Sequence, residues 1–145
     1  MVVIKGYTEI GRVINSGFTS SGSVAIDAME LTDVASGNKE SGVLIEVKEG
    51  GRLDNSDRSF IDYDEVDALL AGLDYISNAK SDVTKLNLFE ATYKTKGDFS
   101  VTTFNNRSGK IEAAVKSGYI HPASVFLSLQ QLSELRALIL QAKQK

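Results

Sequence analysis

Hydrophobic residues recur along two stretches of the chain with the period of about 3.6 residues that is typical of an amphipathic helix. The first stretch carries Val66, Leu69, Leu70, Leu73 and Ile76 at this spacing. The second carries Leu132, Leu135, Leu138, Ile139 and Ala142. The pattern predicts one helix near the middle of the sequence and one near its end. Gly72 lies inside the first, where glycine costs about 1 kcal/mol relative to alanine, so we expect a neighbour packed closely against it.

Residues of alternating polarity precede each helix, and this two-residue period is typical of strands with one buried face. In "SVAIDAMEL" (residues 23–31), Val24, Ile26 and Ala28 alternate with Ala25 and Asp27. The pattern predicts strands near residues 7–14, 23–32 and 42–49, and again near residues 87–95, 98–105 and 110–117. Lys96-Gly97 and "NNRSG" (residues 105–109) have the composition of turns between the last three strands.

The two helix entrances resemble each other. "SFIDYDEVDALLAGLDYI" (residues 59–76) aligns with "VFLSLQQLSELRALILQA" (residues 125–142), with Phe60 matched to Phe126. Each copy has the spacing of a capping box, Asp62 with Glu65 and Ser128 with Gln131, and of a hydrophobic staple, Ile61 with Val66 and Leu127 with Leu132. "VKEG" (residues 47–50) and "VKSG" (residues 115–118) extend the match. The alternative is a chance similarity of two well-capped helices.

A small sheet with one helix leaves apolar surface and strand edges uncovered. Two such units can cover each other. We therefore predict an α+β protein of two pseudo-repeated units, each an antiparallel β-sheet of three to four strands followed by one α-helix. The halves, about 1–80 and 81–145, are expected to form a single domain over residues 1–145.

The composition is that of a soluble globular protein, with 42% hydrophobic and 24% charged residues, one proline and no cysteine. No apolar run approaches the roughly 20 residues that cross a bilayer, so no membrane association is expected. The opening "MVVIKGYTEIGRV" lacks the features of a signal peptide. This favours the cytoplasm and leaves open a leader that has been removed.

The sequence contains few of the residue types that carry out catalysis. His121 is the one histidine, and without cysteine neither a Cys/His pair nor a multi-histidine zinc site can form within one chain. "GFTSSGSV" (residues 17–24) has phosphate-loop glycines but no lysine. "DNSDRSFIDYDE" (residues 54–65) resembles a calcium loop, but Arg58 and Ser59 replace a ligand and the essential glycine. We predict no enzymatic activity, catalytic residue, cofactor or metal.

Charge is distributed unevenly. Residues 1–78 hold six Lys/Arg and fourteen Asp/Glu, whereas residues 79–145 hold ten and five. Such a chain can pair its halves within a monomer or dimer, associate with neighbouring copies, or offer its basic half to an anion. A homo-oligomer is expected.

A basic, aromatic surface is predicted on the second sheet. Cations that follow phosphates and aromatic rings that stack on bases are typical of single-stranded nucleic-acid binding. Alternation puts Phe99 and Val101 on one face and Phe104 on the other, so at least one of these rings must be buried. The candidate binding residues are Tyr93, Lys94, Lys96, Phe99, Arg107, Lys110, Lys116 and Tyr119.

"YKTKGDFSVTTF" (residues 93–104) and "FLSLQQLSELRALI" (residues 126–139) resemble the basic hairpin and the helix entrance of the Whirly and PUR-alpha superfamily. The resemblance implies curved antiparallel sheets, each followed by a helix, that bind single-stranded DNA or RNA. The acidic segment "IEVKEGGRLDNSD" (residues 45–57) departs from that pattern. The sequence thus predicts a non-enzymatic binding or scaffold protein for single-stranded nucleic acid. The alternative is a protein–protein interaction module that assembles through its acidic and basic halves.

Overall fold

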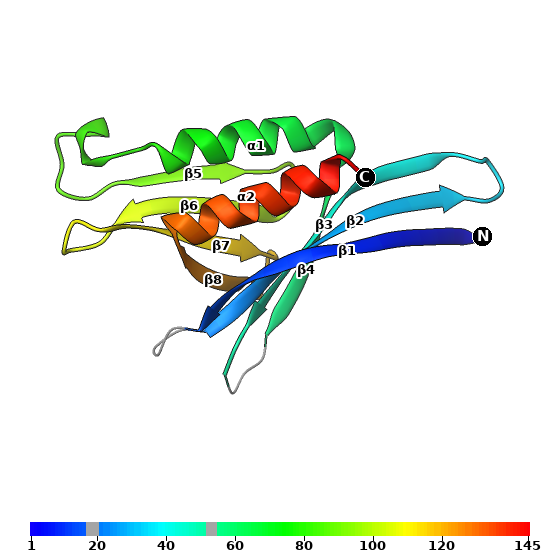
Figure 1. Ribbon diagram of the computed structural model, residues 1–145, viewed down its shortest axis with the longest axis horizontal. Helices are drawn as coiled ribbons and strands as arrows, with labels where there is room; N and C mark the ends of the chain where they lie inside the picture. The colour runs from blue at the N-terminus through cyan, green and yellow to red at the C-terminus, as the bar shows by residue number, and fades with distance from the viewer. Residues whose placement is uncertain (17–20, 52–54) are drawn as a thin grey trace.

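The computed structural model describes residues 1–16, 21–51 and 55–145, which form two four-stranded antiparallel sheets, each followed by a helix (Figure 1). The first sheet comprises β1 (Val3–Ser16), β2 (Ser21–Asp33), β3 (Lys39–Glu49) and β4 (Ser56–Asp62), and α1 (Tyr63–Ser77) follows it. The second comprises β5 (Glu90–Lys94), β6 (Phe99–Asn105), β7 (Ile111–Ser117) and β8 (Ala123–Ser128), and α2 (Leu129–Lys143) follows it. A short 3-10 helix, η1 (Ser81–Val83), lies between the units. The predicted α+β class and the repeated strands-then-helix unit are confirmed.

The repeated sequence is the last strand of each sheet running directly into a helix. Phe60 in β4 and Phe126 in β8 occupy equivalent positions, two residues before the end of the strand. These two strands were not among the six predicted, because their few residues had been assigned to the helix entrances. The six predicted strands, the two turns and both helices are present. No helix in the described part of the chain is long and apolar enough to cross a membrane.

Both sheets turn one face toward a shared core, and the two helices cover that core (Figure 1). α1 packs on β5 and β6 and reaches β3 and β4, while α2 crosses β1, β2 and β3 and contacts β8. The inner faces meet directly near β8. There a Cβ atom on Gly22 would lie 2.7 Å from Cγ2 of Val125, so only glycine leaves room for that strand. The opposite face of each sheet has neither helix on it.

Ion pairs join the acidic half to the basic half within the chain. Arg136 of α2 pairs with Asp74 of α1 at 2.6 Å, and Lys143 pairs with Asp67 at 2.5 Å. The carboxylate of Glu49 accepts a hydrogen bond from the backbone N–H of Ser124 at 2.9 Å. Part of the charge asymmetry is therefore satisfied inside the monomer.

The two helix entrances differ in their hydrogen bonds. Ser128 and Gln131 form the predicted capping box, with each side chain accepting from the other residue's backbone N–H. At the first entrance the prediction is wrong, because Asp62 makes no side-chain cap. Glu65 instead accepts a hydrogen bond from the backbone N–H of Lys96 at 2.8 Å. The carboxylate that would have closed the box is thus committed to the β5–β6 turn.

This difference predicts unequal effects of two matching substitutions. Ser128→Ala removes an N-cap hydrogen bond and is expected to lower the free energy of unfolding by about 1 kcal/mol. Asp62→Ala removes no such bond, and we expect it to change the free energy of unfolding by no more than about 0.5 kcal/mol. Urea unfolding of both variants measures the two effects. Equal losses would contradict the assignment of one capped and one uncapped entrance.

Candidate nucleic-acid interface

The face of the second sheet that points away from the helices carries three rows of exposed or half-buried side chains, and we call it the open face of the second sheet. Residues directly opposite each other in an antiparallel sheet point to the same side, so the strand register defines the rows. They are Lys94, Ser100, Lys116 and Ser124; then Thr92, Thr102, Ala114 and Phe126; then Glu90, Phe104, Glu112 and Ser128. None of these side chains belongs to the core.

Two of the predicted binding residues lie on the opposite, helix-facing side. Phe99 is 0% exposed and is part of the core, so it cannot stack on a base in the folded protein. Tyr93 is half-buried against α1, where a Cβ atom on Gly72 would come within 2.3 Å of the Tyr93 ring. Burial, with a smaller effect from the charge of Glu65, raises the pKa of Tyr93. These two aromatic residues therefore support the fold and do not belong to the open face.

Four of the predicted residues gather at one end of the second sheet. Lys94 and Lys116 share a row of the open face, with Ser100 between them. Lys96 lies in the adjoining β5–β6 turn, and Tyr119 follows β7, 83% exposed, on the connection to β8. We call this group, Lys94, Lys96, Lys116 and Tyr119, the basic end. Because one strand separates Lys94 from Lys116, their backbones are about 10 Å apart.

The remaining two predicted residues are not brought to that end. Arg107 and Lys110 lie in the β6–β7 turn, beyond the far end of β6. The seven residues of β6 separate this turn from the basic end, a span of about 20 Å. Glu90 and Glu112 lie in the row of the open face that is nearest to the β6–β7 turn. The open face therefore changes from basic at one end to mixed charge at the other.

Sequence reasoning missed the aromatic pair of this face. Phe104 and Phe126 contact each other edge to face, with ring centroids 6.2 Å apart, and Phe126 is 45% exposed. Beside them the hydroxyls of Thr92 and Thr102 are 2.8 Å apart in a hydrogen bond. The alternation of side chains within β6 had already placed Phe104 and Phe99 on opposite faces of the sheet. Phe126 was overlooked because β8 was not recognised as a strand.

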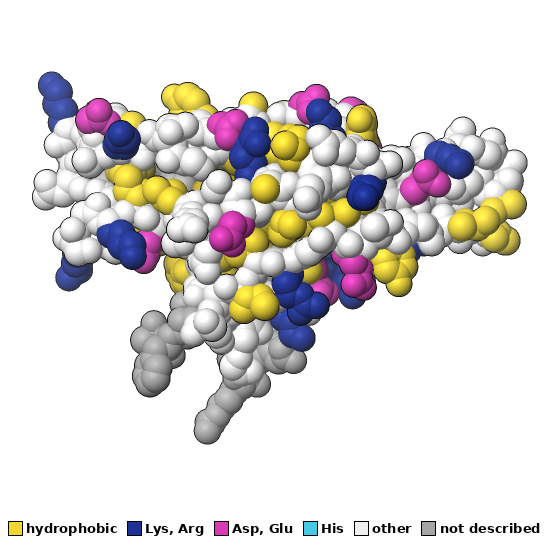
Figure 2. Space-filling view, in the orientation of Figure 1, with side chains coloured by type: hydrophobic (Ala, Val, Ile, Leu, Met, Phe, Trp, Pro, Cys, Tyr) yellow, Lys and Arg dark blue, Asp and Glu magenta, His cyan; other side chains and the backbone are white. Residues whose placement is uncertain are grey.

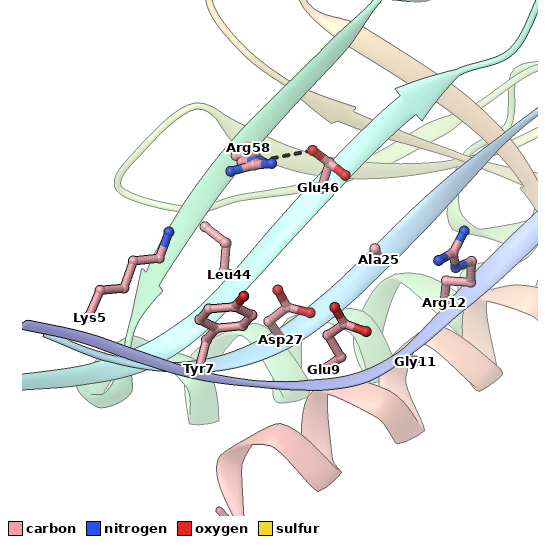
Figure 3. Close-up of a pocket in the computed structure, with 10 residues that line it drawn as sticks. All are labelled: Lys5, Tyr7, Glu9, Gly11, Arg12, Ala25, Asp27, Leu44, Glu46 and Arg58. Carbon is pink, nitrogen blue, oxygen red and sulfur yellow. Dashed lines mark hydrogen bonds and ion pairs between the residues drawn. The ribbon is translucent and has the colours of Figure 1, made fainter.

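The outward face of the first sheet has a different character. An open pocket of about 340 Å³ crosses its four strands (Figure 3). Its charged side chains are three acids and three bases: Glu9, Asp27, Glu46, Lys5, Arg12 and Arg58. Arg58 donates to Glu46 at 2.9 Å. Its three carboxylates offset its three cations, so this pocket attracts a polyanion less than a surface of lysines alone would.

Asp27 is the acid most affected by this pocket. Partial burial, followed by the charges of Glu9 and Glu46, raises the pKa of its carboxyl group. Glu9 lies directly opposite it on β1, an arrangement of like charges that destabilises a sheet. The ionised form of Asp27 is thus disfavoured in the folded protein.

The sign of this shift gives a pH-dependent prediction. A carboxyl group with a raised pKa in the folded state destabilises the protein where it is ionised, above its unfolded pKa of about 3.9. We expect Asp27→Asn to stabilise the protein at pH 7, and the gain to shrink as the pH falls through the raised pKa of the folded state and to vanish below about 4. Thermal unfolding across this pH range measures it, and a gain that persists at low pH would contradict the electrostatic cause.

Other segments singled out from the sequence show no assembled site. Among residues 1–16, 21–51 and 55–145, no three His, Asp or Glu side chains are grouped to hold a metal ion. Asp54 and residues 17–20 lie outside the described residues, while Gly22 and Ser23 belong to β2. His121 is exposed, and its carbonyl accepts a hydrogen bond from Asn55 at 3.3 Å.

Comparison with known proteins adds no assignment. No protein-family model matches the sequence, and no curated protein is significantly similar to it.

Proposed function

We propose that this is a non-enzymatic protein that binds single-stranded DNA or RNA across the open face of the second sheet. The observation that carries the proposal is that two exposed lysines share one face of the sheet with an aromatic pair, of which Phe126 is exposed and Phe104 half-buried. Lys94 and Lys116 supply cations in one row, and Phe104 and Phe126 supply rings in the two rows beyond it. The resemblance to the Whirly and PUR-alpha superfamily implies the same class of ligand.

The chemistry of the face suits a single strand. Lysine ammonium groups pair with phosphates as point charges, and serine and threonine hydroxyls along the rows can donate further hydrogen bonds to phosphate or base. Bases stack on exposed rings with about 1–3 kcal/mol each, which requires unpaired bases. The bound DNA or RNA would cross β5 to β8, from the basic end toward Phe126. The mixed charge near Glu90 and Glu112 limits the electrostatic contact to one end.

Fluorescence anisotropy with labelled oligonucleotides at low salt tests the proposal. We expect Lys94→Glu with Lys116→Glu to weaken binding at least about tenfold, since two phosphate contacts become repulsive. The matched control is Lys80→Glu with Lys85→Glu, because both lysines are exposed on the α1–β5 connection and the net charge changes equally. No binding by the unaltered protein at micromolar concentration, or equal losses in both double variants, would contradict the proposal.

A protein–protein module that assembles through its acidic and basic halves is the other function considered. The internal pairs of Arg136 with Asp74 and of Lys143 with Asp67 already use part of that complementarity. For this reason we prefer nucleic acid as the ligand. Assembly through charge alone would loosen as ionic strength rises, and sedimentation in increasing salt distinguishes it.

A further inference from the structure

β1 presents a long edge with which no other strand of the described chain pairs. It is the outermost strand of the first sheet, with 14 residues, and it pairs only with β2. Its N-terminal part extends beyond α2 together with the β2–β3 hairpin (Figure 1). Figure 2 shows hydrophobic side chains at this projecting end. Along the same strand, Ile4 is 59% exposed and Tyr7 is 60% exposed. Exposed edges of this kind are templates for pairing with another strand.

The hydrogen-bond pattern shows which backbone groups are available. Val34 donates to the carbonyl of Val2 at 3.1 Å, and the register places Val3 opposite Asp33. Because hydrogen-bonded and non-bonded pairs alternate in an antiparallel ladder, even-numbered residues from Val2 to Thr8 bond to β2. The N–H and C=O groups of Val3, Lys5, Tyr7 and Glu9 therefore point outward.

The available edge ends near Glu9. The β1–β2 register shifts between Glu9 and Gly11, which is the position of a bulge. Beyond the bulge the carbonyl of Ile14 accepts a hydrogen bond from the side chain of Gln131 at 3.1 Å. An added strand can thus pair with residues 3–9 only.

We propose that β1 pairs antiparallel with β1 of a second copy of this chain, about a two-fold axis through Tyr7. In this register Lys5 lies opposite the partner's Glu9, and Glu9 lies opposite the partner's Lys5. The outward groups of Lys5, Tyr7 and Glu9 in both copies form about six backbone hydrogen bonds. Such a contact is isologous, because both copies use the same surface.

The charges on β1 favour this register over those with the two-fold axis at another residue. An axis through Lys5 would put the two lysines opposite each other, and an axis through Glu9 would do the same with the two glutamates, which is unfavourable. An axis through Gly6 or Thr8 pairs no opposite charges. Only the axis through Tyr7 matches Lys5 with an acid on the same face of the sheet, where Figure 3 shows both side chains beside Tyr7.

The opposite face of the joined sheet also gains cover. Ile4 lies opposite the partner's Ile10, and Gly6 lies opposite the partner's Thr8. Ile10 packs partly against the core of its own chain, so it extends that core toward the exposed Ile4. The open pocket of the first sheet, which Lys5, Tyr7 and Glu9 line, continues across the axis into the pocket of the second copy. The dimer does not depend on nucleic-acid binding, which concerns the other sheet.

Sedimentation velocity over a range of protein concentrations tests the dimer through a charge exchange. Glu9→Lys and Lys5→Glu each place like charges opposite each other, and either is expected to weaken dimerisation at least about tenfold. The double variant Lys5→Glu with Glu9→Lys restores the pairing and the dimer. Glu30→Lys is the matched control, because Glu30 is exposed on β2, pairs with Lys39 of β3 and, lying opposite Gly6, faces the other side of the sheet from Lys5 and Glu9.

A backbone variant tests the edge itself. Tyr7→Pro removes an outward N–H that β2 does not use, and proline is tolerated at such edge positions, so we expect a folded monomer by circular dichroism and sedimentation. A protein that is monomeric at all concentrations up to about 100 μM would overturn the proposal. A dimer that is equally strong in Glu9→Lys, Lys5→Glu and Glu30→Lys would overturn it as well.

Discussion

Residues 1–80 and residues 81–145, produced as separate fragments, are each expected to lack a cooperative unfolding transition. Val24, Ile45 and Val47 of the first half and Val115 and Val125 of the second belong to one cluster of buried side chains. Either fragment alone would expose its share of that cluster to water. A core in a chain of fewer than about 80 residues rarely supplies more than 3–5 kcal/mol, so losing half of it is expected to abolish folding.

The matched experiment recombines the two fragments. Mixing them is expected to restore the circular dichroism of the intact chain, because the core and the ion pairs between α1 and α2 can reform. The intact chain cleaved once in the exposed connection near Leu86 serves as the positive control. A cooperative thermal transition in either isolated fragment would contradict the prediction that the halves complete each other.

Gly72→Ala is expected to destabilise the protein by about 1–3 kcal/mol, as overpacking of a core does. In most helices the same substitution stabilises by about 1 kcal/mol. The sign reverses here because a Cβ atom at Gly72 would lie 2.3 Å from Cδ2 and 2.6 Å from Cγ of Tyr93. These atoms are at the base of a ring held between α1 and the sheet, so they cannot move aside independently.

A double-mutant cycle isolates this contact. In the Tyr93→Ala background, Gly72→Ala has no ring to meet and is expected to stabilise the protein by its helix propensity, about 1 kcal/mol. Gly97→Ala in the β5–β6 turn is the control, because a Cβ atom there meets nothing within 4 Å. Urea unfolding provides the free energies. Stabilisation by Gly72→Ala in the presence of Tyr93 would show that the ring does not restrict the helix.

The helices and most strands could be predicted because their patterns are local. The spacing of Val66, Leu69 and Leu73, and of Leu132 and Leu135, follows directly from the geometry of a helix with one buried face. The close neighbour expected at Gly72 is Tyr93. The match of "VKEG" with "VKSG" is also confirmed, since both segments lie at the end of the third strand of their sheet.

The composition of the candidate site was less predictable for a physical reason. Alternation separates a strand into two faces but does not say which face a helix covers. Phe99 and Tyr93 were placed on the candidate surface, yet both face the helices. Phe104 and Phe126 occupy the exposed face instead. The capping box predicted at Asp62 is absent because of a long-range contact that local sequence does not reveal. Glu65 accepts a hydrogen bond from Lys96, a residue 31 positions later in the chain.

The central claim, that the open face of the second sheet holds a single strand, is tested most directly by amide NMR. An unlabelled oligonucleotide is added to isotope-labelled protein, and the shifted resonances are mapped onto the structure. We predict that they concentrate at Lys94, Ser100, Thr102, Lys116 and Phe126. Shifts confined to β1–β4, or none at saturating oligonucleotide, would contradict it.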